Sequence, residues 1–186
     1  VWHAHCVKLS RSESKLFSKT CTGIAHCPTS NMRLASGIAP VRDWIDLGVK
    51  VGLGVDGSSS NDSGHLLAEA RQTMLLQRVK HGAENFSARE ALKIATKGGA
   101  ETLCRRDIGE ISVGKAADFA IYDLNQIDMS GTLSDPIAAL IFWGPIKTKY
   151  TICNGSIIAE NGHMKNFDLN ISLEDHKLAS KRLLSI

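Results

Sequence analysis

The sequence predicts an α/β fold in which parallel strands alternate with helices, as in an eightfold βα barrel. Three short apolar runs begin near residues 1, 23 and 51 and have the length of strands that are buried on both faces. Helical patterns separate these runs. The strand starts are spaced close to the roughly 30 residues that one βα unit of such a barrel occupies.

The run 51–55 is the most informative of the three. It ends on a single carboxylate, Asp56, which is followed by Gly57 and three serines. In α/β barrels, catalytic and metal-binding groups follow the carboxyl ends of the strands, which gives Asp56 a functional interpretation. An aspartate before a Gly/Ser turn is also a common helix cap, so this stretch alone leaves both alternatives open.

The segments between and after these strands have helical or loop character. A polar stretch at 10–19 has the pattern of a surface helix, and the turn-rich residues 28–37 predict a loop. Residues 39–47 predict a helix that starts near Pro40. Residues 62–80 predict a long amphipathic helix. Ser87 and Glu90 have the spacing of a capping box that opens a further helix, which continues towards residue 103.

Beyond residue 106 the pattern changes to β structure. We expect a strand at 117–124, a short helix at 135–142, a hairpin formed by 150–153 and 156–160 around Asn154-Gly155, and a surface helix at 172–184. These strands do not fit the βα alternation, so they predict a small second β domain. The expected domains are residues 1–106 for the barrel portion, 107–165 for the β domain and 166–186 for a C-terminal tail.

Composition excludes several classes of protein. The net charge of +3 arises from 22 basic and 19 acidic residues, a balance that does not favour a nucleic-acid partner. No apolar run approaches the roughly 18 residues of a membrane span, so no membrane partner is expected. The five cysteines form no CxxC pair, which disfavours a disulfide framework or a structural zinc site. We therefore expect a cytoplasmic protein whose cysteines are buried small apolar residues.

Three candidate site residues follow the three predicted strands. These are His5, His26 and Asp56, placed at the strand ends that would meet on one face of a barrel. An imidazole can hydrogen-bond a reacting oxygen, and a carboxylate can bind a metal and take a proton from its water. A single divalent metal needs three or more ligands, however, and this sequence offers one well-placed carboxylate. A complete metal site is therefore not expected within these residues.

Five motifs in order resemble one known family. They are AHC (4–6), HCPTSNMRLASGIAPV (26–41), LGVDGSSSNDS (53–63), GGAETL (98–103) and IGEISVGKAADFAIYDL (108–124). Together they resemble the C-terminal part of the amidohydrolase superfamily, in its cytosine/guanine deaminase and triazine hydrolase branch, and most closely the 8-oxoguanine deaminases. The similarity covers residues 1–162 or so.

The resemblance implies the C-terminal part of a TIM-like (β/α)8 barrel plus part of a small β-sandwich domain. It also implies one divalent metal, zinc with iron as the alternative, and hydrolytic deamination of a purine-like ring such as 8-oxoguanine. Asp56 matches the family's metal ligand and proton shuttle after the eighth strand. His5 matches the histidine after the sixth strand, which lies beside the metal-bound hydroxide. His3 is interpreted as structural, because Ala-His-Cys is the sixth-strand pattern rather than the family's HxH pair.

Two further residues in the loop after the second run are candidates for contact with the substrate. Arg33 suits carbonyl or ring-nitrogen acceptors because its guanidinium is rigid and planar. Asn31 is the other candidate, with loop bracing through backbone hydrogen bonds as the alternative.

The family's HxH pair and fifth-strand histidine have no counterpart in this sequence. We therefore expect the chain to be a fragment that is inactive and poorly folded alone. The alternatives are a triazine or other aromatic amidohydrolase and a non-catalytic truncated remnant. Small heterocycles are the expected partners, and homo-oligomers are usual in such a family.

Overall fold

The computed structural model describes residues 1–144 and 146–184, and it confirms an α/β chain. Residues group into two compact units, which are described separately. The first comprises Val1–Lys115 with Leu124–Ile146, and the second comprises Ala116–Asp123 with Lys147–Ile186. These bounds differ from the domains expected from the sequence, because 124–146 belongs to the first unit rather than to a β domain at 107–165.

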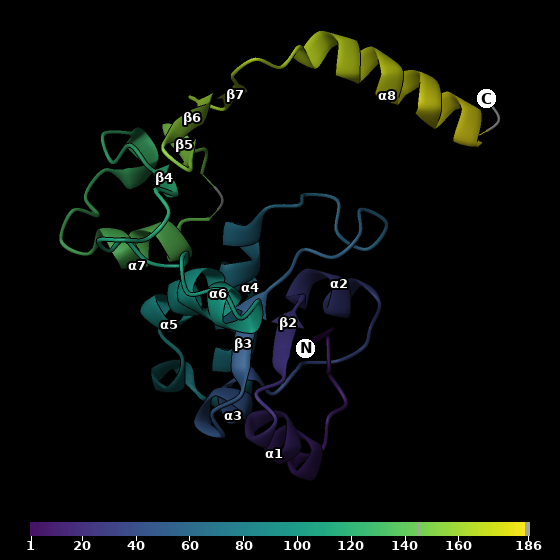
Figure 1. The fold of residues 1–186 in the computed structure, drawn as a ribbon, viewed down its shortest axis with the longest axis vertical. Coiled ribbons are helices and arrows are strands. Elements are labelled where there is room, and N and C mark those ends of the chain that lie inside the picture. The colour runs from purple at the N-terminus through teal and green to yellow at the C-terminus, as the bar shows by residue number, and fades with distance from the viewer. Residues whose placement is uncertain (145, 185–186) are drawn as a thin grey trace. The chain divides into compact units, whose positions relative to one another are not determined.

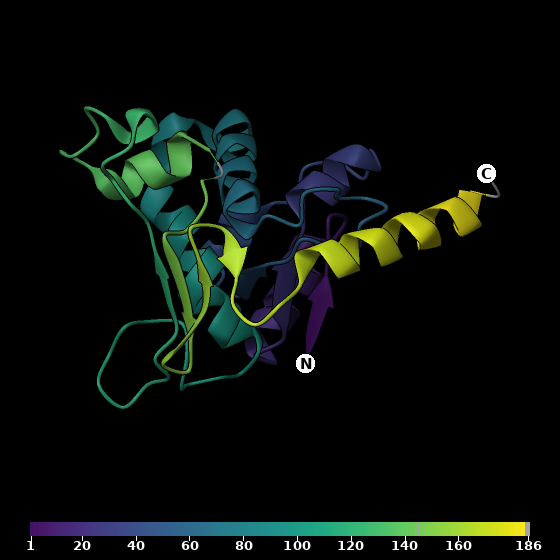
Figure 2. The ribbon, with the colours of Figure 1, turned by 90° about the horizontal axis from the view of Figure 1, so that it is seen from above.

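The first unit is built on a parallel sheet of strands β1 (Trp2–Ala4), β2 (Gly23–His26) and β3 (Lys50–Leu53), in that order (Figures 1 and 2). Ala4 pairs in register with Ala25, and Ala25 with Gly52. All three strands therefore point the same way, and their carboxyl ends lie along one edge of the sheet. The residues that follow β1, β2 and β3 are brought together there.

The strands are shorter than the sequence predicts. The first strand ends at Ala4, and the run 51–55 is a strand only as far as Leu53. The cause at the first strand is the backbone of His5 and Cys6, which have φ values of 63° and 53°. Asp56 likewise has a φ of 64°. This left-handed conformation is incompatible with an extended strand.

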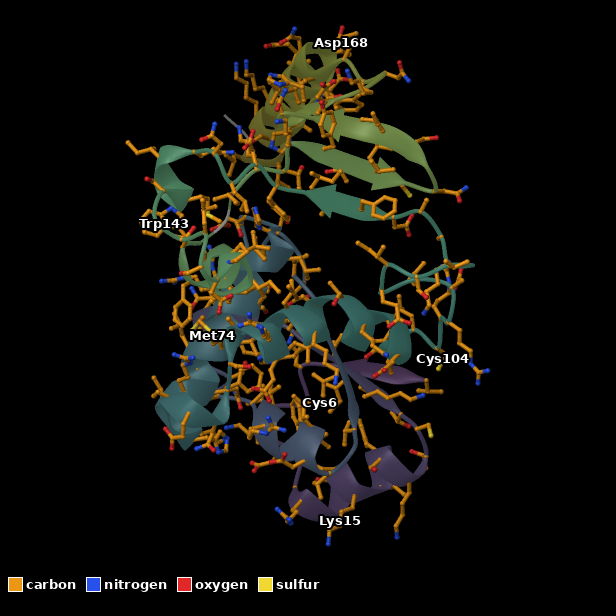
Figure 3. All side chains as sticks on the ribbon, turned by 90° about the vertical axis from the view of Figure 1, so that its left-hand side faces the viewer. Cys6, Lys15, Met74, Cys104, Trp143 and Asp168 are labelled. Carbon is orange, nitrogen blue, oxygen red and sulfur yellow. The ribbon has the colours of Figure 1, made fainter. Side chains whose placement is uncertain are left out.

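Helices of the first unit pack against the sheet and against one another (Figure 1). Helix α1 (Arg11–Lys19) opens with a capping box at Ser10, and α3 (Val41–Asp46) packs on β3. The long helix α4 (Leu66–His81) carries the fully buried Met74, which Figure 3 labels. It is followed by a 3-10 turn η1 (Ala83–Asn85) and by α5 (Ala88–Lys93), and the predicted capping box of Ser87 and Glu90 is confirmed.

The loop expected at 28–37 is partly wrong, because Pro28–Arg33 forms helix α2. Pro28 occupies the first turn, where its missing N–H has no helical partner to lose. The side chains of Ser30 and Asn31, which would otherwise favour a turn, bond to residues on other elements instead. Their local turn preference is therefore overridden by tertiary contacts.

A π-helical turn (η2, Ile94–Gly98) leads into α6 (Gly99–Thr102), which packs against β2 and β3. Glycines allow this close approach. A Cβ on Gly98 would lie 2.1 Å from the carbonyl oxygen of Val51, and one on Gly52 would lie 2.9 Å from Cα of Gly99. The GGAETL motif is thus explained by helix-on-strand packing.

The remaining elements of the first unit are a 3-10 turn η3 (Ile127–Met129) and α7 (Pro136–Phe142). Helix α7 packs on α4 and α5, where Arg78 stacks over the ring of Phe142 at 5.0 Å. Asp135 caps α7 by accepting from the backbone N–H of Ala138, which explains the start of the helix expected at 135–142.

The second unit is a four-stranded antiparallel sheet in the order β4 (Phe119–Ile121), β5 (Tyr150–Cys153), β6 (Ser156–Glu160) and β7 (His163–Met164), followed by α8 (Leu169–Leu184). The hairpin predicted around Asn154-Gly155 is confirmed, with positive φ at both turn residues. Asp118 braces it by accepting from the N–H of Asn154 at 2.7 Å. The long helix α8 (Figure 2) has no buried residue.

Cysteine burial differs from expectation. Among the described residues Cys27 is buried, whereas Cys21, Cys104 and Cys153 are exposed and Cys6 is intermediate, and none is disulfide-bonded. Three of the five therefore lie on the surface instead of filling the core. None of the helices in the described ranges has the length and apolar character to span a bilayer.

Gly98→Ala should destabilise the protein by about 1–3 kcal/mol or more, since the added methyl meets a backbone carbonyl that cannot rotate away. Gly99→Ala is the matched control: its Cβ would have no neighbour within 4 Å, and the helix should gain up to about 1 kcal/mol. Urea denaturation of both variants measures the difference. Equal stability of the two would contradict the packing described for η2.

His26 should make stability depend on pH. Its ring is fully buried, and that burial, followed by the nearby His5, lowers its pKa from 6.5 to about 3. The unfolded chain takes up a proton below pH 6.5 whereas the folded chain does not, so stability is complete above that pH and is lost as pH falls towards 3. The slope should approach about 1.4 kcal/mol per pH unit.

The free energy of unfolding at pH 7.5 and pH 5 tests this. His26→Leu should flatten the pH dependence, whereas substituting glutamine for the exposed His163 should leave it unchanged. If the free energy of unfolding of His26→Leu depends on pH as steeply as that of the wild type, the pH dependence belongs to another group.

Candidate active site

The carboxyl edge of the parallel sheet carries a group of polar side chains from the segments that follow its three strands. His5 follows β1, Ser30 and Asn31 lie on α2 after β2, and Asp56 follows β3. Both His5 and Asp56 have left-handed backbones, a conformation that costs a non-glycine residue roughly 1–2 kcal/mol. Such strain persists only where the surroundings hold the residue in place, and it concentrates at functional sites.

Asp56 is held as a carboxylate. Its Oδ2 accepts hydrogen bonds from the hydroxyls of Ser30 at 2.6 Å and Ser60 at 2.9 Å. The hydrogen bond from Ser30, a backbone bond from Gly57 and the bond from Ser60 lower the pKa of Asp56 to about 2. The side chain is 33% exposed, so the ionised group remains accessible to a ligand.

His5 lies beside this carboxylate and is held from its other side. Its Nε2 is 3.6 Å from Oδ2 of Asp56, and its Nδ1 is 2.9 Å from Oδ1 of Asn31. Asn31 is only 2% exposed. The sequence interpretation placed Asn31 in a loop facing substrate or bracing backbone; the structure places it on α2, in contact with His5. An ionised carboxylate and an imidazole at this separation can exchange protons with one small molecule lying against both.

A buried carboxylate that the sequence analysis missed connects the loops under the site. Glu69, in the first turn of α4, is fully buried. Its Oε2 accepts from the N–H of Thr29 at 3.0 Å and its Oε1 from Nδ2 of Asn61 at 2.8 Å. Asn61 also donates to the carbonyl of Val55 at 2.9 Å. Glu69 thereby ties the start of α2 to the loop that carries Asp56.

A signal for Glu69 was present in the sequence. It falls among Leu67, Ala70 and Met74, which form the buried side of α4. A carboxylate on the apolar side of a helix needs buried partners, because an unpaired buried charge is costly. That pattern could have identified Glu69 as part of a network, though not its partners.

Two other candidates have different partners. The ring of the buried His26 meets Trp44 edge-on at a centroid distance of 6.4 Å. Arg33 is half exposed and pairs with Asp62 at 2.5 Å. Arg33 therefore engages an acidic surface residue in this structure. The ring of His3 lies against that of Phe17, with the centroids 5.4 Å apart and an interplanar angle of 39°.

Cys27 directly follows β2 at the same edge. Burial, followed by the charges of Asp56 and Glu69, raises the pKa of this thiol to about 11. It is a neutral, weakly polar side chain at physiological pH, so it is a poor nucleophile here. Its Sγ lies 3.0 Å from where a Cβ on Gly54 would stand, which gives the glycine of the LGVDG motif a packing role.

The site fits a metal ion only in part. Within 1–144 and 146–184, no group of three or more His, Cys, Asp or Glu side chains is arranged to hold one. The hydrogen bonds that Asp56 accepts from the hydroxyls of Ser30 and Ser60 both end on Oδ2. Asp56 has the donor chemistry of one metal ligand, and the remaining ligands are not supplied by these residues.

Comparison with known proteins gives one family. The amidohydrolase family pattern matches residues 1–158. The chain is 39% identical to 8-oxoguanine deaminase from Pseudomonas aeruginosa over 184 residues, which cover 99% of this chain and 41% of that protein. It is 36% identical to hydroxydechloroatrazine ethylaminohydrolase from Pseudomonas sp. strain ADP, covering 90% of this chain and 36% of the relative.

Solved structures give the same result. Atrazine chlorohydrolase from Arthrobacter aurescens, complexed with zinc, superposes with a TM-score of 0.89 at 36% identity, covering 96% of this chain and 40% of the other. An adenosine deaminase from Xanthomonas campestris with bound zinc superposes with a TM-score of 0.94 at 26% identity, covering 100% and 43%. The chain thus spans less than half the length of the proteins it resembles.

Glu69→Leu should destabilise the protein by about 2–4 kcal/mol, because the N–H of Thr29 and the amide of Asn61 lose a buried charged acceptor. Glu101→Gln, at an exposed helical position, is the control and should change stability by less than about 0.5 kcal/mol. Chemical denaturation measures both. A Glu69→Leu variant as stable as the control would show that the two loops are held by other contacts.

Proposed function

Since the chain belongs to the amidohydrolase family, we propose that the full-length protein hydrolytically removes an exocyclic amino group from a purine-like ring such as 8-oxoguanine. The observation that carries this proposal is the juxtaposition of His5 Nε2 and the ionised Asp56, 3.6 Å apart at the carboxyl edge of the sheet. His5 and Asp56 lie in the family motifs AHC and LGVDGSSSNDS, which occur along the chain in the family's order. Water and the ring amine are converted to a ring carbonyl and ammonia.

In this proposal the full-length protein would hold one divalent metal, zinc or alternatively iron, whose chemistry when bound would be to activate water. Zinc is favoured because the atrazine chlorohydrolase and adenosine deaminase structures contain it. Asp56 would be one of its ligands, and the segment of the full-length protein that precedes this chain would supply the others. The hydrogen bonds that Ser30 and Ser60 donate to Oδ2 would hold the carboxylate in place for that role.

The two site residues then move protons. Asp56 is a carboxylate at neutral pH, because its pKa is about 2, so it can accept a proton from water and release it to the departing amine. His5 presents Nε2 to the same space, where it can hydrogen-bond the ring position under attack. In this proposal the hydroxyls of Ser30 and Ser60 donate their hydrogen bonds to Asp56 and do not act on the substrate.

The three-stranded parallel sheet supports the proposal that these strands are one part of a larger barrel. In the described residues β1 is an edge strand, all three of its residues are exposed, and Trp2 is 48% exposed. Parallel sheets are normally covered and paired on both sides. We propose that β1, β2 and β3 are the sixth to eighth strands of a TIM-like barrel, which a preceding strand would continue at β1. The second unit would then be part of a composite β domain.

A triazine or other aromatic amidohydrolase is the second candidate. The observation that favours it is the pair of relatives that act on triazines, which match the chain about as well as the purine deaminases do. Purines and triazines differ in ring size and in their exocyclic groups. The side chains that contact His5 and Asp56 in this chain do not favour one ring over the other. A non-catalytic truncated remnant is the third candidate, and it predicts no turnover of either ring.

Ammonia release by the zinc-loaded full-length protein tests the reaction on 8-oxoguanine, guanine and a chlorotriazine, with chloride release followed in parallel for the triazine. We expect 8-oxoguanine to be the preferred substrate. Preference for the triazine would support the second candidate, and release from none of the rings would contradict the proposed function.

Asp56→Asn should lower kcat by about 10²–10⁴-fold, because the amide cannot take up the proton. It should also lower the zinc content that metal analysis finds. Asp62→Asn removes a neighbouring acid that pairs with Arg33 at the surface, and it should retain the wild-type kcat. Full activity in Asp56→Asn would remove Asp56 from the mechanism without contradicting the reaction itself.

A further inference from the structure

We propose that Asn31 is a positioning residue that fixes the ring of His5 with its proton on Nδ1, so that Nε2 is the nitrogen that faces the reacting group. This inference rests on the proposed function, because it concerns the same site. It assigns Asn31 a role through His5, in place of the direct substrate contact expected from the sequence.

The geometry allows Asn31 to hold the ring and excludes Asp56 from doing so. Oδ1 of Asn31 lies 2.9 Å from Nδ1 of His5, within ordinary hydrogen-bond distance. Oδ2 of Asp56 lies 3.6 Å from Nε2, beyond that distance, and already accepts from two serines. The ring is therefore fixed from its Nδ1 side.

The hydrogen bond determines which ring nitrogen carries the proton. With the Asn31 amide oriented as in this structure, its oxygen faces the ring and can only accept, so the ring supplies the hydrogen from Nδ1. The neutral ring then has its lone pair on Nε2, on the side of Asp56. The opposite tautomer would place a lone pair against Oδ1 of Asn31 and lose the bond. In enzymes that use histidine, the partner of the second ring nitrogen sets the tautomer in this way.

Asn31 is itself held rigidly. Its backbone N–H donates to the carbonyl of Cys27 at 3.0 Å and its own carbonyl accepts from Ser36 at 2.9 Å. The start of the same helix is anchored through Thr29 to Glu69. Two consecutive residues of α2 thus hold the two reactive groups: Ser30 bonds Asp56, and Asn31 bonds His5. Asn31 is only 2% exposed and lies on an anchored helix, so it can hold the ring of His5 in one orientation. The backbone of His5 itself has a positive φ.

The two ends of the Asn31 amide separate positioning from substrate binding. Positioning uses Oδ1, whereas the buried Nδ2 has no hydrogen-bond partner within the residues that the structure describes and would be the donor to a substrate. Asn31→Asp keeps an acceptor at Oδ1 and removes the donor. Asn31→Leu keeps a similar volume and removes both.

The test uses the full-length zinc-loaded enzyme and these two variants. Asn31→Leu should lower kcat by about 10–100-fold, the range for removing a partner that orients a functional histidine, with KM changed by less than about twofold. Asn31→Asp should recover most of that loss. Loss of activity in Asn31→Asp together with a raised KM would instead assign Asn31 to substrate binding and overturn the proposal, as would a wild-type kcat in Asn31→Leu.

Nitrogen-15 NMR of histidine-labelled enzyme gives a readout that does not depend on turnover. The His5 signals are identified by their absence in His5→Gln. We expect a protonated Nδ1 and an unprotonated Nε2 in the wild type and in Asn31→Asp, and a tautomer mixture in Asn31→Leu. A neutral wild-type ring protonated on Nε2 would overturn the proposal.

The outcomes also separate this inference from the proposed reaction. If the wild type releases no ammonia from any ring, the proposed function fails, while the tautomer of His5 still reports on Asn31. If the wild type is active and the tautomer is unchanged in Asn31→Leu, only the role of Asn31 fails. If Asn31→Leu does not fold, the wild-type tautomer and the KM of Asn31→Asp decide.

Discussion

The carboxylate of Glu69 is the constraint on which the candidate site depends. It is fully buried and accepts hydrogen bonds from Thr29, at the start of α2, and from Asn61, in the loop after β3. A buried ion of this kind stabilises only when its partners are in place, and removing them leaves an uncompensated charge. The helix α2 and the loop after β3 must therefore occupy fixed positions for Glu69 to be paired.

From that anchor the site follows in two steps. Fixing α2 places Ser30 and Asn31 at the edge of the sheet, and fixing the loop places Ser60 beside Asp56. Asp56 is then ionised and oriented, and His5 is oriented by Asn31 at the distance where both can meet one ligand. The proposed reactive pair, His5 and Asp56, is thus the outer part of a hydrogen-bond network, and the buried Glu69 is its inner part.

Local signals in the sequence predicted the elements that depend on neighbouring residues. The capping box of Ser87 and Glu90 and the hairpin at Asn154-Gly155 are set within four residues or so, and both were predicted at their observed positions. Asp56 could be singled out because a buried strand that ends on an acid is a local pattern. Its role was still open, since a helix cap has the same local signature.

Interactions between distant residues account for what the sequence did not predict. Asn31 lies 26 positions from His5, and Thr29 lies 40 positions from Glu69. No periodicity connects such pairs, so α2 was expected to be a loop and Asn31 a substrate contact. His26 illustrates the same limit: its position at a strand end suggested the site, but as the last residue of β2 it packs against Trp44 on α3, which is distant in sequence.

The strained backbones at His5 and Asp56 show why this network has to be so complete. Each positive φ opposes folding by roughly 1–2 kcal/mol, and neither residue is a glycine that would relieve it. A glycine could adopt the turn but would carry no side chain, so the fold must keep the acid and the imidazole and hold them by contacts. Ser30, Ser60 and Asn31 supply those contacts from elements already fixed by Glu69. The strain is therefore a consequence of turning two functional side chains towards one point at the end of short parallel strands, and the buried carboxylate network is what makes that arrangement stable.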